Sequence, residues 1–108
     1  MNILIDTNIA LYFLSGDKKI GILLDNTFPH LSFLTELELL AYPGLVKQEE
    51  KEIKAFIDEC ITVDINDPIK ERTIDIRQQA NLKLPDAIIA ATAIAEQLPF
   101  FSADNDFK

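Results

Sequence analysis

The sequence has little of the chemistry that disulfides and soft metal sites need. It holds one cysteine, Cys60, and one histidine, His30, among its 108 residues. A single cysteine excludes an intramolecular disulfide and a thiolate metal cage. A single histidine excludes a histidine-rich metal site and leaves little basis for Ser-His or Cys-His catalysis. We therefore expect both residues to be structural, with His30 at the surface or in a turn and Cys60 as a small buried side chain.

Long apolar runs are also missing. No stretch approaches the roughly 20 apolar residues that a membrane-spanning helix needs, and the N-terminal residues lack the basic start and apolar middle of a signal peptide. We therefore expect no membrane partner and a cytoplasmic location. Hydrophobic residues make up 48% and charged residues 26% of the chain. This composition predicts a single folded domain, residues 1–108, rather than a disordered chain.

Positive charge is scarce, with ten Lys and Arg against eighteen Asp and Glu and a net charge of −8. Proteins that bind nucleic acid independently of sequence are usually basic, because cationic side chains replace the counterions of the phosphates. The lysines of residues 47–54 alternate with glutamates, which predicts a solvated helix. One possibility is that the protein binds no nucleic acid and that its acidic residues keep it soluble. The other is that it binds nucleic acid through local cations, metal ions or a partner.

Short apolar runs alternate with helical patterns along the chain. The predicted strands are residues 3–5, 31–34, 61–65 and 100–102, and the predicted helices are residues 9–14, 19–24, 36–41, 47–60, 67–81 and 86–97. Thr35 and Asp67 are expected to cap two of these helices. Alternating strands and helices predict an α/β fold with a central parallel sheet covered on both faces. Ligands of such sheets bind at the carboxyl ends of the strands.

Four acidic residues are placed where they can meet at that edge. Asp6 follows the first predicted strand and Asp104 follows the last. Glu38 lies one turn into the helix after the second strand, and Asp86 opens the helix before the last strand. Each position alone also fits a structural role, as a helix cap, a solvated acid, a charge near a helix N-terminus or a turn residue. Their conjunction predicts an acidic site.

Glu38 is the acid of its helix that we expect to face the site. Thr35 and Glu38 are three residues apart and share a helix face, whereas Glu36 points elsewhere and is expected to be solvated. Carboxylates in one pocket repel, by roughly 4 kcal/mol for a pair about 4 Å apart at an effective dielectric of about 20. Such a cluster holds protons or a hard cation, and its oxygens suit Mg²⁺ or Mn²⁺ rather than zinc. The cation can activate water and stabilise charge on a phosphoryl oxygen.

Four segments of the sequence resemble the PIN domain, and in particular the VapC-type ribonuclease toxins of bacterial toxin–antitoxin systems. They read ILIDTN at residues 3–8, TELELL at residues 35–40, LPDAIIAATA at residues 84–93 and SADNDF at residues 102–107. The match spans the whole chain with the motifs in the order of the family. The segment around Asp86 is the most specific of the four.

The resemblance implies a PIN-like three-layer α/β/α sandwich and a Mg²⁺- or Mn²⁺-dependent endoribonuclease. The family's acids fall on Asp6, Glu38, Asp86 and Asp104. Asp6 and Asp86 are then the most direct metal ligands, while Glu38 and Asp104 bind a second metal or orient the attacking water. Accessory roles fall on Asp106, Thr7, Asn8, Thr35 and Ser102. The implied partners are an RNA substrate, a small antitoxin whose basic tail enters the acidic pocket, and a second copy in a homodimer.

Two points remain open in the sequence. Similar proteins usually continue past the Asp-Phe pair into a final strand, whereas this sequence ends at Lys108, so that edge strand is expected to be absent, supplied by a neighbour or removed. The main alternative function is an inactive PIN scaffold that binds RNA or protein. A haloacid-dehalogenase-like phosphatase fits less well, because Asn8 stands where a second Asp is needed. A response-regulator receiver lacks its acidic pair.

Overall fold

One parallel sheet forms the centre of the protein. In the computed structural model, residues 1–103 are described, and these contain four strands in the order β3-β2-β1-β4. The strands are β1 (Asn2–Ile5), β2 (Phe28–Ser32), β3 (Ile61–Val63) and β4 (Phe100–Phe101). All neighbouring pairs are parallel. The expected central parallel sheet is therefore confirmed.

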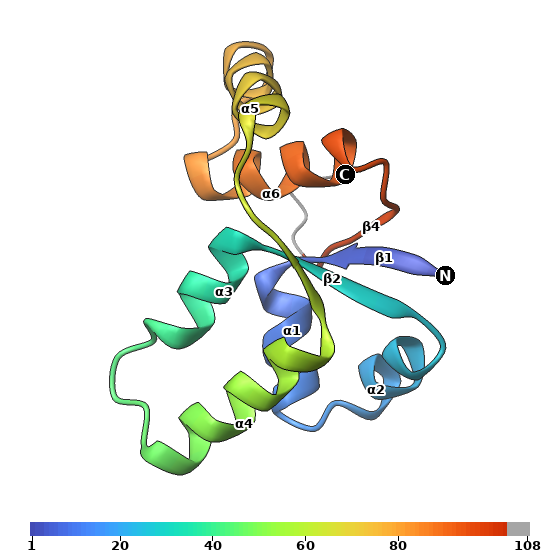
Figure 1. Cartoon of the computed structure of the whole chain (residues 1–108), viewed down its shortest axis with the longest axis vertical. Coiled ribbons are helices and arrows are strands. Elements are labelled where there is room, and N and C mark those ends of the chain that lie inside the picture. Colours follow the sequence, from blue (N-terminus) through green and yellow to red (C-terminus); the bar gives the residue numbers. More distant parts are fainter. Residues whose placement is uncertain (104–108) are drawn as a thin grey trace.

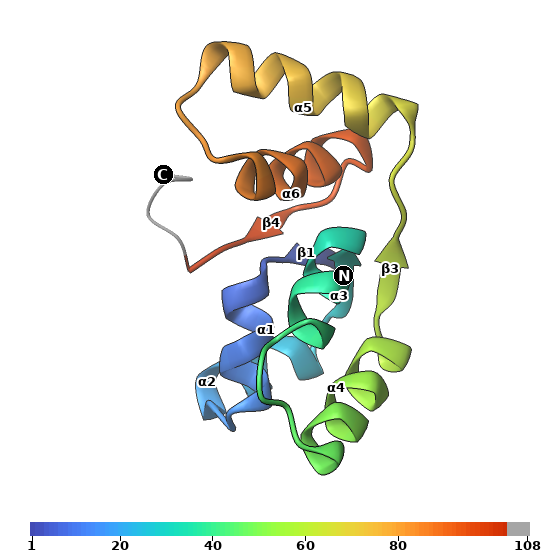
Figure 2. The ribbon, with the colours of Figure 1, turned by 90° about the vertical axis from the view of Figure 1, so that its left-hand side faces the viewer.

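Helices cover both faces of the sheet. They are α1 (Thr7–Leu14), α2 (Lys18–Asp25), α3 (Phe33–Leu40), α4 (Lys47–Glu59), α5 (Asp67–Gln79) and α6 (Leu84–Ala95). The first four lie on one side of the sheet, and α5 and α6 lie on the other, with α6 next to the strands (Figures 1 and 2). This arrangement is the predicted α/β/α sandwich. In the described part of the chain, no helix is long and apolar enough to cross a membrane.

Successive side chains of β1 point to opposite faces of the sheet, and both faces are buried. Ile3 and Ile5 belong to the core shared with α1 to α4, whereas Leu4 packs with Ile89 and Ala93 of α6. Successive side chains of a strand point to opposite faces, so a continuous apolar run suits a strand covered twice. Each of these β1 side chains is completely buried.

The boundary between β2 and α3 differs from the prediction. The strand covers residues 28–32 instead of 31–34, and the helix cap is Ser32, whose side chain accepts the Leu34 N–H at 3.2 Å. Thr35 lies inside the helix and is fully buried. Pro29 is tolerated in β2 because pairing with β3 begins only at His30, so its missing N–H faces no partner strand there.

His30 is a second correction. It was expected at the surface or in a turn, but it lies within β2 and is buried. Its Nδ1 lies 3.0 Å from the Phe28 carbonyl oxygen, which gives the ring a hydrogen-bond partner without a metal or catalytic role. The strand begins at Phe28, three residues before the predicted start, and so includes His30.

Other element ends shift by a few residues. The third strand ends at Val63 rather than at residue 65, the fourth at Phe101, and α6 covers Leu84–Ala95 rather than residues 86–97. The α5 helix is capped by Asn66, which accepts the Ile69 N–H, and not by Asp67. Asn66 and Asp67 are both good capping residues, so the sequence alone does not separate them.

Candidate functional site

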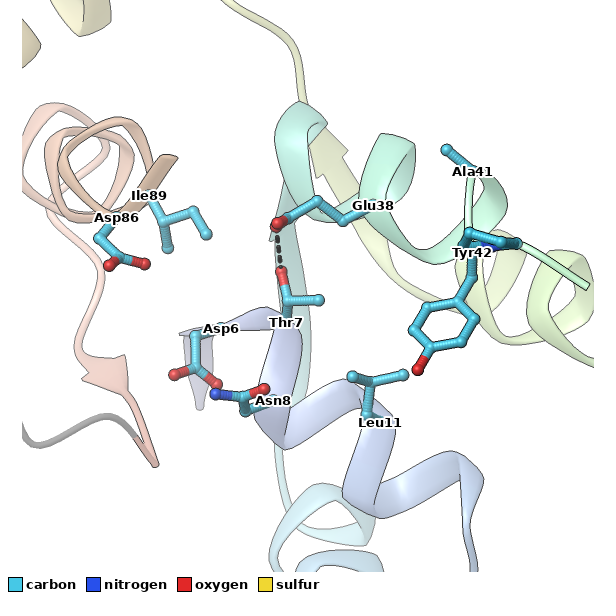
Figure 3. A pocket seen from close by; sticks show the side chains of 10 residues that line it. Asp6, Thr7, Asn8, Leu11, Glu38, Ala41, Tyr42, Asp86 and Ile89 are labelled. Atoms are coloured by element: carbon cyan, nitrogen blue, oxygen red, sulfur yellow. Dashed lines mark hydrogen bonds between the residues drawn. The ribbon is translucent and has the colours of Figure 1, made fainter. Parts of the chain in front are cut away.

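Three of the predicted acids line one pocket at the carboxyl edge of the sheet. Asp6, Glu38 and Asp86 share a cavity of about 430 Å³ (Figure 3). Its other walls are formed by Thr7, Asn8, Leu11, Ala41, Tyr42, Pro43 and Ile89. Residues from distant parts of the sequence meet here because β1 and β2 both end at this edge and α1 and α3 begin directly after them.

Helical spacing determines which side chains line the pocket. Positions three and four apart share a helix face. The lining residues follow this rule in α1 (Thr7, Asn8, Leu11), in and just after α3 (Glu38, Ala41, Tyr42) and in α6 (Asp86, Ile89). The first turns of α1 and α6 both contribute, and the positive ends of these helices offset part of the carboxylate repulsion.

Asp6 is held in place by several hydrogen bonds. It is 4% exposed. Its Oδ1 accepts the Ile9 N–H at 2.8 Å, which makes it the N-cap of α1. Its Oδ2 accepts the Ser102 hydroxyl at 2.6 Å and the Ala103 N–H at 3.2 Å. Three donors thus fix the carboxylate and stabilise its charge, and they tie the end of β1 to the segment after β4.

Glu38 is held by a chain of two hydroxyls. The Thr7 hydroxyl donates to Glu38 Oε1 at 2.7 Å, and Thr7 Oγ1 lies 3.0 Å from Thr35 Oγ1. A hydroxyl has one proton to donate, and that of Thr7 is used on Glu38. Thr35, which is fully buried, is therefore the donor to Thr7. The hydrogen bonds run from Thr35 through Thr7 to the exposed carboxylate.

Asp86 lines the acidic end of the pocket from α6, which lies on the other face of the sheet from α1 and α3 (Figure 1). It lies in the first turn of α6, half-buried, and faces the cavity across from Glu38 (Figure 3). Glu36 does not line the pocket, as expected from the helix geometry. It is half-buried, however, whereas Glu38 is exposed, so the expectation that Glu36 is the solvated acid was wrong about exposure.

The described residues do not contain a preassembled metal cage. Within residues 1–103, no three Asp, Glu, His or Cys side chains lie close enough to hold one metal ion. Asp104 and Asp106, the two remaining predicted acids, lie outside the described residues. The donor set of the pocket consists of oxygens. Mg²⁺ is usually held by one or two carboxylates together with water, and this donor chemistry fits that requirement.

No Lys or Arg side chain lines this pocket in the described part of the chain.

The basic residues lie elsewhere. The α4 lysines are exposed, and Lys54 pairs with Glu50 at 2.8 Å, which raises the pKa of Lys54. The expected solvated helix is confirmed. Arg77 donates to the Leu82 carbonyl oxygen at 2.7 Å. Among residues 1–103, the lining of the pocket is therefore acidic at one end and holds no Lys or Arg that could pair with a phosphate.

Cys60 is structural, as expected, although it is only partly buried. It packs against the core below the sheet. Burial, with a smaller contribution from Glu59, raises the pKa of the thiol to about 12. The thiol is therefore protonated at neutral pH, and a thiolate is what nucleophilic or metal-binding chemistry requires.

The apolar and aromatic residues of the pocket lining were missed by the sequence analysis. Leu11, Tyr42 and Ile89 each lie three or four residues after a predicted site residue. That spacing is the signal that could have identified them, since it places them on the same helix faces as Thr7, Glu38 and Asp86. The loop residue Pro43 carries no comparable signal.

The sequence profile described as "PIN domain" matches residues 3–108. The chain belongs to the PIN domain family. A chain in a toxin–antitoxin complex from Klebsiella pneumoniae is similar to this PIN domain, with 30% identity and a TM-score of 0.87. The match covers 97% of this chain and 89% of the other. Curated protein sequences gave no match to this PIN domain.

Two further structures share the fold. VapBC2 from Rickettsia felis, solved with a DNA fragment from its promoter, gives a TM-score of 0.79 at 17% identity, covering 96% of this PIN domain and all of that chain (100%). FitAcB from Neisseria gonorrhoeae gives 0.73 at 20% identity, covering 98% of this PIN domain and 89% of that chain. At these identities the likeness concerns the fold alone.

Proposed function

We propose that the protein is a divalent-metal-dependent endoribonuclease that cleaves RNA phosphodiester bonds, and that it is the toxin of a toxin–antitoxin pair. The observation that carries the proposal is the convergence of Asp6, Glu38 and Asp86 on one pocket. Membership of the PIN family and the similarity to a chain of a toxin–antitoxin complex support it. Carboxylates gathered in one pocket repel a phosphodiester, and a bound metal ion would offset that repulsion.

The proposed roles divide the acids into two groups. Asp6 and Asp86 would hold Mg²⁺ or Mn²⁺, while Glu38 and Asp104 would orient the attacking water or hold a second ion. When bound, the cation would supply an activated water and stabilise negative charge on the phosphoryl oxygens. Ser102 would keep Asp6 in place through its 2.6 Å hydrogen bond. Thr7 and Thr35 would orient Glu38 through the hydroxyl chain.

Asn8 and Asp106 are the remaining residues with a proposed accessory role. Asn8 lines the pocket beside Asp6, where its amide can bond water or substrate. Asp106 is proposed as an additional acid near Asp104 on the resemblance alone. Both assignments stay predictions.

The proposed protein partner is a small antitoxin with a basic tail. A pocket lined by three carboxylates, in a chain of net charge −8, is complementary to such a tail. An antitoxin whose Lys or Arg side chains occupy the pocket would compete with the metal ion and block the substrate. A homodimer is also proposed, again on the resemblance.

Replacing Asp6 by Asn tests the enzymatic proposal. Asn keeps the oxygen that caps α1 but cannot accept the Ala103 N–H with its amide nitrogen, so Asp6→Asn loses the charge that holds the metal and its folding is checked by urea unfolding. We expect wild-type protein to cleave cellular RNA with Mg²⁺ or Mn²⁺ and to stop with EDTA, and Asp6→Asn to lose at least about tenfold in rate. Asp17→Asn is the matched control, because Asp17 caps α2 through the Ile20 N–H and lies outside the pocket.

The outcomes separate the proposed enzyme from its main alternative. Unchanged cleavage by Asp6→Asn would contradict the assignment of the pocket as the active site. Binding of RNA or antitoxin by the purified wild type, with no cleavage in either metal, would instead favour an inactive PIN scaffold.

A further inference from the structure

We propose that the end of the pocket formed by Tyr42 is a nucleobase subsite, where an unpaired base of the RNA stacks on the tyrosine ring while its neighbouring phosphate lies at the acids. This inference rests on the proposed function and names the part of the substrate that the apolar half of the pocket takes. It goes beyond the acids, because the subsite would bind a base even in a variant that cannot cleave.

The shape of the pocket supports two adjoining subsites. Asp86 and Tyr42 stand on opposite sides of it, with Thr7 and Glu38 between them (Figure 3). The cavity of about 430 Å³ lies in the range of roughly 300–1,000 Å³ typical of small-molecule sites. It is therefore larger than a hydrated metal ion requires, and the additional space is bounded by Leu11, Ala41, Tyr42 and Pro43.

Tyr42 has the properties of a stacking platform. Its side chain is 60% exposed although it lines the cavity, so a ring face is accessible to a ligand. The residue follows the Ala41 C-cap of α3 and precedes Pro43. A residue before proline is restricted to extended conformations, and a tyrosine side chain has only two torsions to order. The ring is thus placed with little freedom to lose on binding.

The charge of the pocket explains why stacking is needed. Most RNA-binding sites gain affinity from Lys and Arg on the phosphates, but neither residue type lines this cavity in the described part of the chain. A metal ion can hold the scissile phosphate, yet it gives no preference for one register of the RNA over another. An aromatic ring beside the acids supplies uncharged affinity and selects RNA whose base is free to leave its stack.

A protein partner is the competing occupant of the ring. Leu11 and Tyr42 also line an adjoining groove with Leu39, Leu45 and Ile53, whose rim carries Glu49 and Glu52. An apolar segment of a partner lying in that groove would also contact Tyr42. RNA is favoured because cleavage at the acids requires the substrate to enter the cavity that the ring shares with them, whereas none of the three acids lines the groove. A basic antitoxin tail in the cavity would compete with the base for the ring.

The absence of tryptophan from the sequence permits a direct binding test. Tyr42→Trp would place the only indole of the protein in the subsite and keep a stacking surface. We would titrate this variant in Mg²⁺ with a short single-stranded RNA whose internucleotide linkages resist cleavage, so that the cation offsets the charge of the acids. Tyr12→Trp is the matched control, because Tyr12 is the other tyrosine, is exposed and lines neither cavity. Saturable quenching should appear for Tyr42→Trp only, and an abasic substitution at one position of the RNA should remove it.

Kinetics give a second readout. With Mn²⁺, Tyr42→Ala should raise KM for the RNA at least about fivefold, the lower end of what one stacked base contributes, with a smaller change in kcat. Tyr42→Phe should behave as wild type because the hydroxyl is not needed for stacking. Tyr12→Ala should also behave as wild type.

The outcomes distinguish the subsite from the nuclease. Cleavage by Tyr42→Ala with wild-type KM, together with no quenching, would overturn the subsite and leave the nuclease intact. Quenching without cleavage in any metal would support the subsite and overturn the nuclease. Neither quenching nor cleavage would overturn both. Loss of antitoxin binding by Tyr42→Ala, with RNA binding unchanged, would assign the ring to the protein partner and also overturn the subsite.

Discussion

A single hydroxyl proton on Thr7 determines the direction of the hydrogen-bond chain that holds Glu38. Thr7 donates to the carboxylate at 2.7 Å and accepts from Thr35 at 3.0 Å. Thr35 is fully buried, so its hydroxyl cannot exchange this bond for one to water. The orientation of an exposed catalytic candidate is therefore set by a residue in the interior.

Removing the Thr35 hydroxyl should weaken the site without removing an acid. Thr35→Val keeps the shape of the side chain but leaves Thr7 without its donor, so Glu38 is less constrained. We expect RNA cleavage to fall by about tenfold, the lower end of what second-layer partners contribute, and Thr35→Ser to retain most of it. Cleavage rates and the Mn²⁺ dissociation constant, measured together with urea unfolding, would check this. Equal rates for the Val variant and wild type would exclude the proposed positioning role.

The role of a residue could be predicted where its place relative to the strands and its preference for a helix cap agreed. Asp6 was placed at the carboxyl edge because it follows a buried strand, and the structure uses it as a helix cap and as a pocket wall. His30 was misplaced because a neighbouring Phe-Pro pair resembles a turn, whereas pairing with β1 extends the strand through it. Burial of that kind depends on partners that are distant in the sequence.

At the scale of elements, the type of each helix and strand was predictable and several ends were not. Ser32 and Thr35 are both good helix caps, and the sequence does not say which is used. The choice follows from the sheet, because Ser32 is the last residue of β2 and pairs with Val63 of β3. The chain therefore enters α3 at once, and the helix turns Glu38 to the pocket.

The connection from α6 to β4 brings Ser102 to Asp6. Leu98 N–H donates to the Ala93 carbonyl oxygen at 2.9 Å and Gln97 N–H to the Ile94 carbonyl oxygen at 3.2 Å, with Gln97 at φ 55°. This is the left-handed helix ending that glycine usually occupies. Beyond it, β4 pairs with β1, which aligns Ser102 with the Asp6 carboxylate.

Gln97→Gly should stabilise this connection. Glycine adopts the left-handed conformation without the cost of about 1–2 kcal/mol that other residues incur, partly offset by the greater freedom of glycine in the unfolded chain. We expect a net gain of about 0.5–1 kcal/mol in the free energy of unfolding, measured with urea. Gln97→Ala is the control and should give no gain, because alanine shares the steric restriction of glutamine. A loss of stability in the glycine variant would contradict this explanation of the turn.

At the scale of the whole molecule, the layers were predictable from the alternation of apolar runs and helices. The ILI run of β1 needs cover on both faces, and the two sets of helices provide it. The edges of the sheet were less predictable, since β3 and β4 contain three and two residues and, within residues 1–103, pair on one side only. The sequence predicts the bounds of a strand poorly where few of its side chains pack against neighbouring elements.

The proposed function requires that Asp6 and Asp86 hold a divalent cation in the pocket. The protein carries a net charge of −8, and gathering Asp6, Glu38 and Asp86 in one cavity adds repulsion that a cation relieves. A ligand that binds the folded state only stabilises it by RT ln(1 + [L]/Kd), about 1.4 kcal/mol at tenfold excess over Kd. For a domain of this size that corresponds to a rise of several degrees in Tm.

The most direct test is the Mg²⁺-induced change in Tm at constant ionic strength, for wild type, Asp86→Asn and Glu36→Gln. Glu36→Gln removes an acidic charge that lies outside the pocket, so it controls for net charge. We predict that Mg²⁺ raises the Tm of wild type and Glu36→Gln by the same several degrees and that of Asp86→Asn by much less. Equal increases in all three proteins would show that the cation binds elsewhere and would contradict the account.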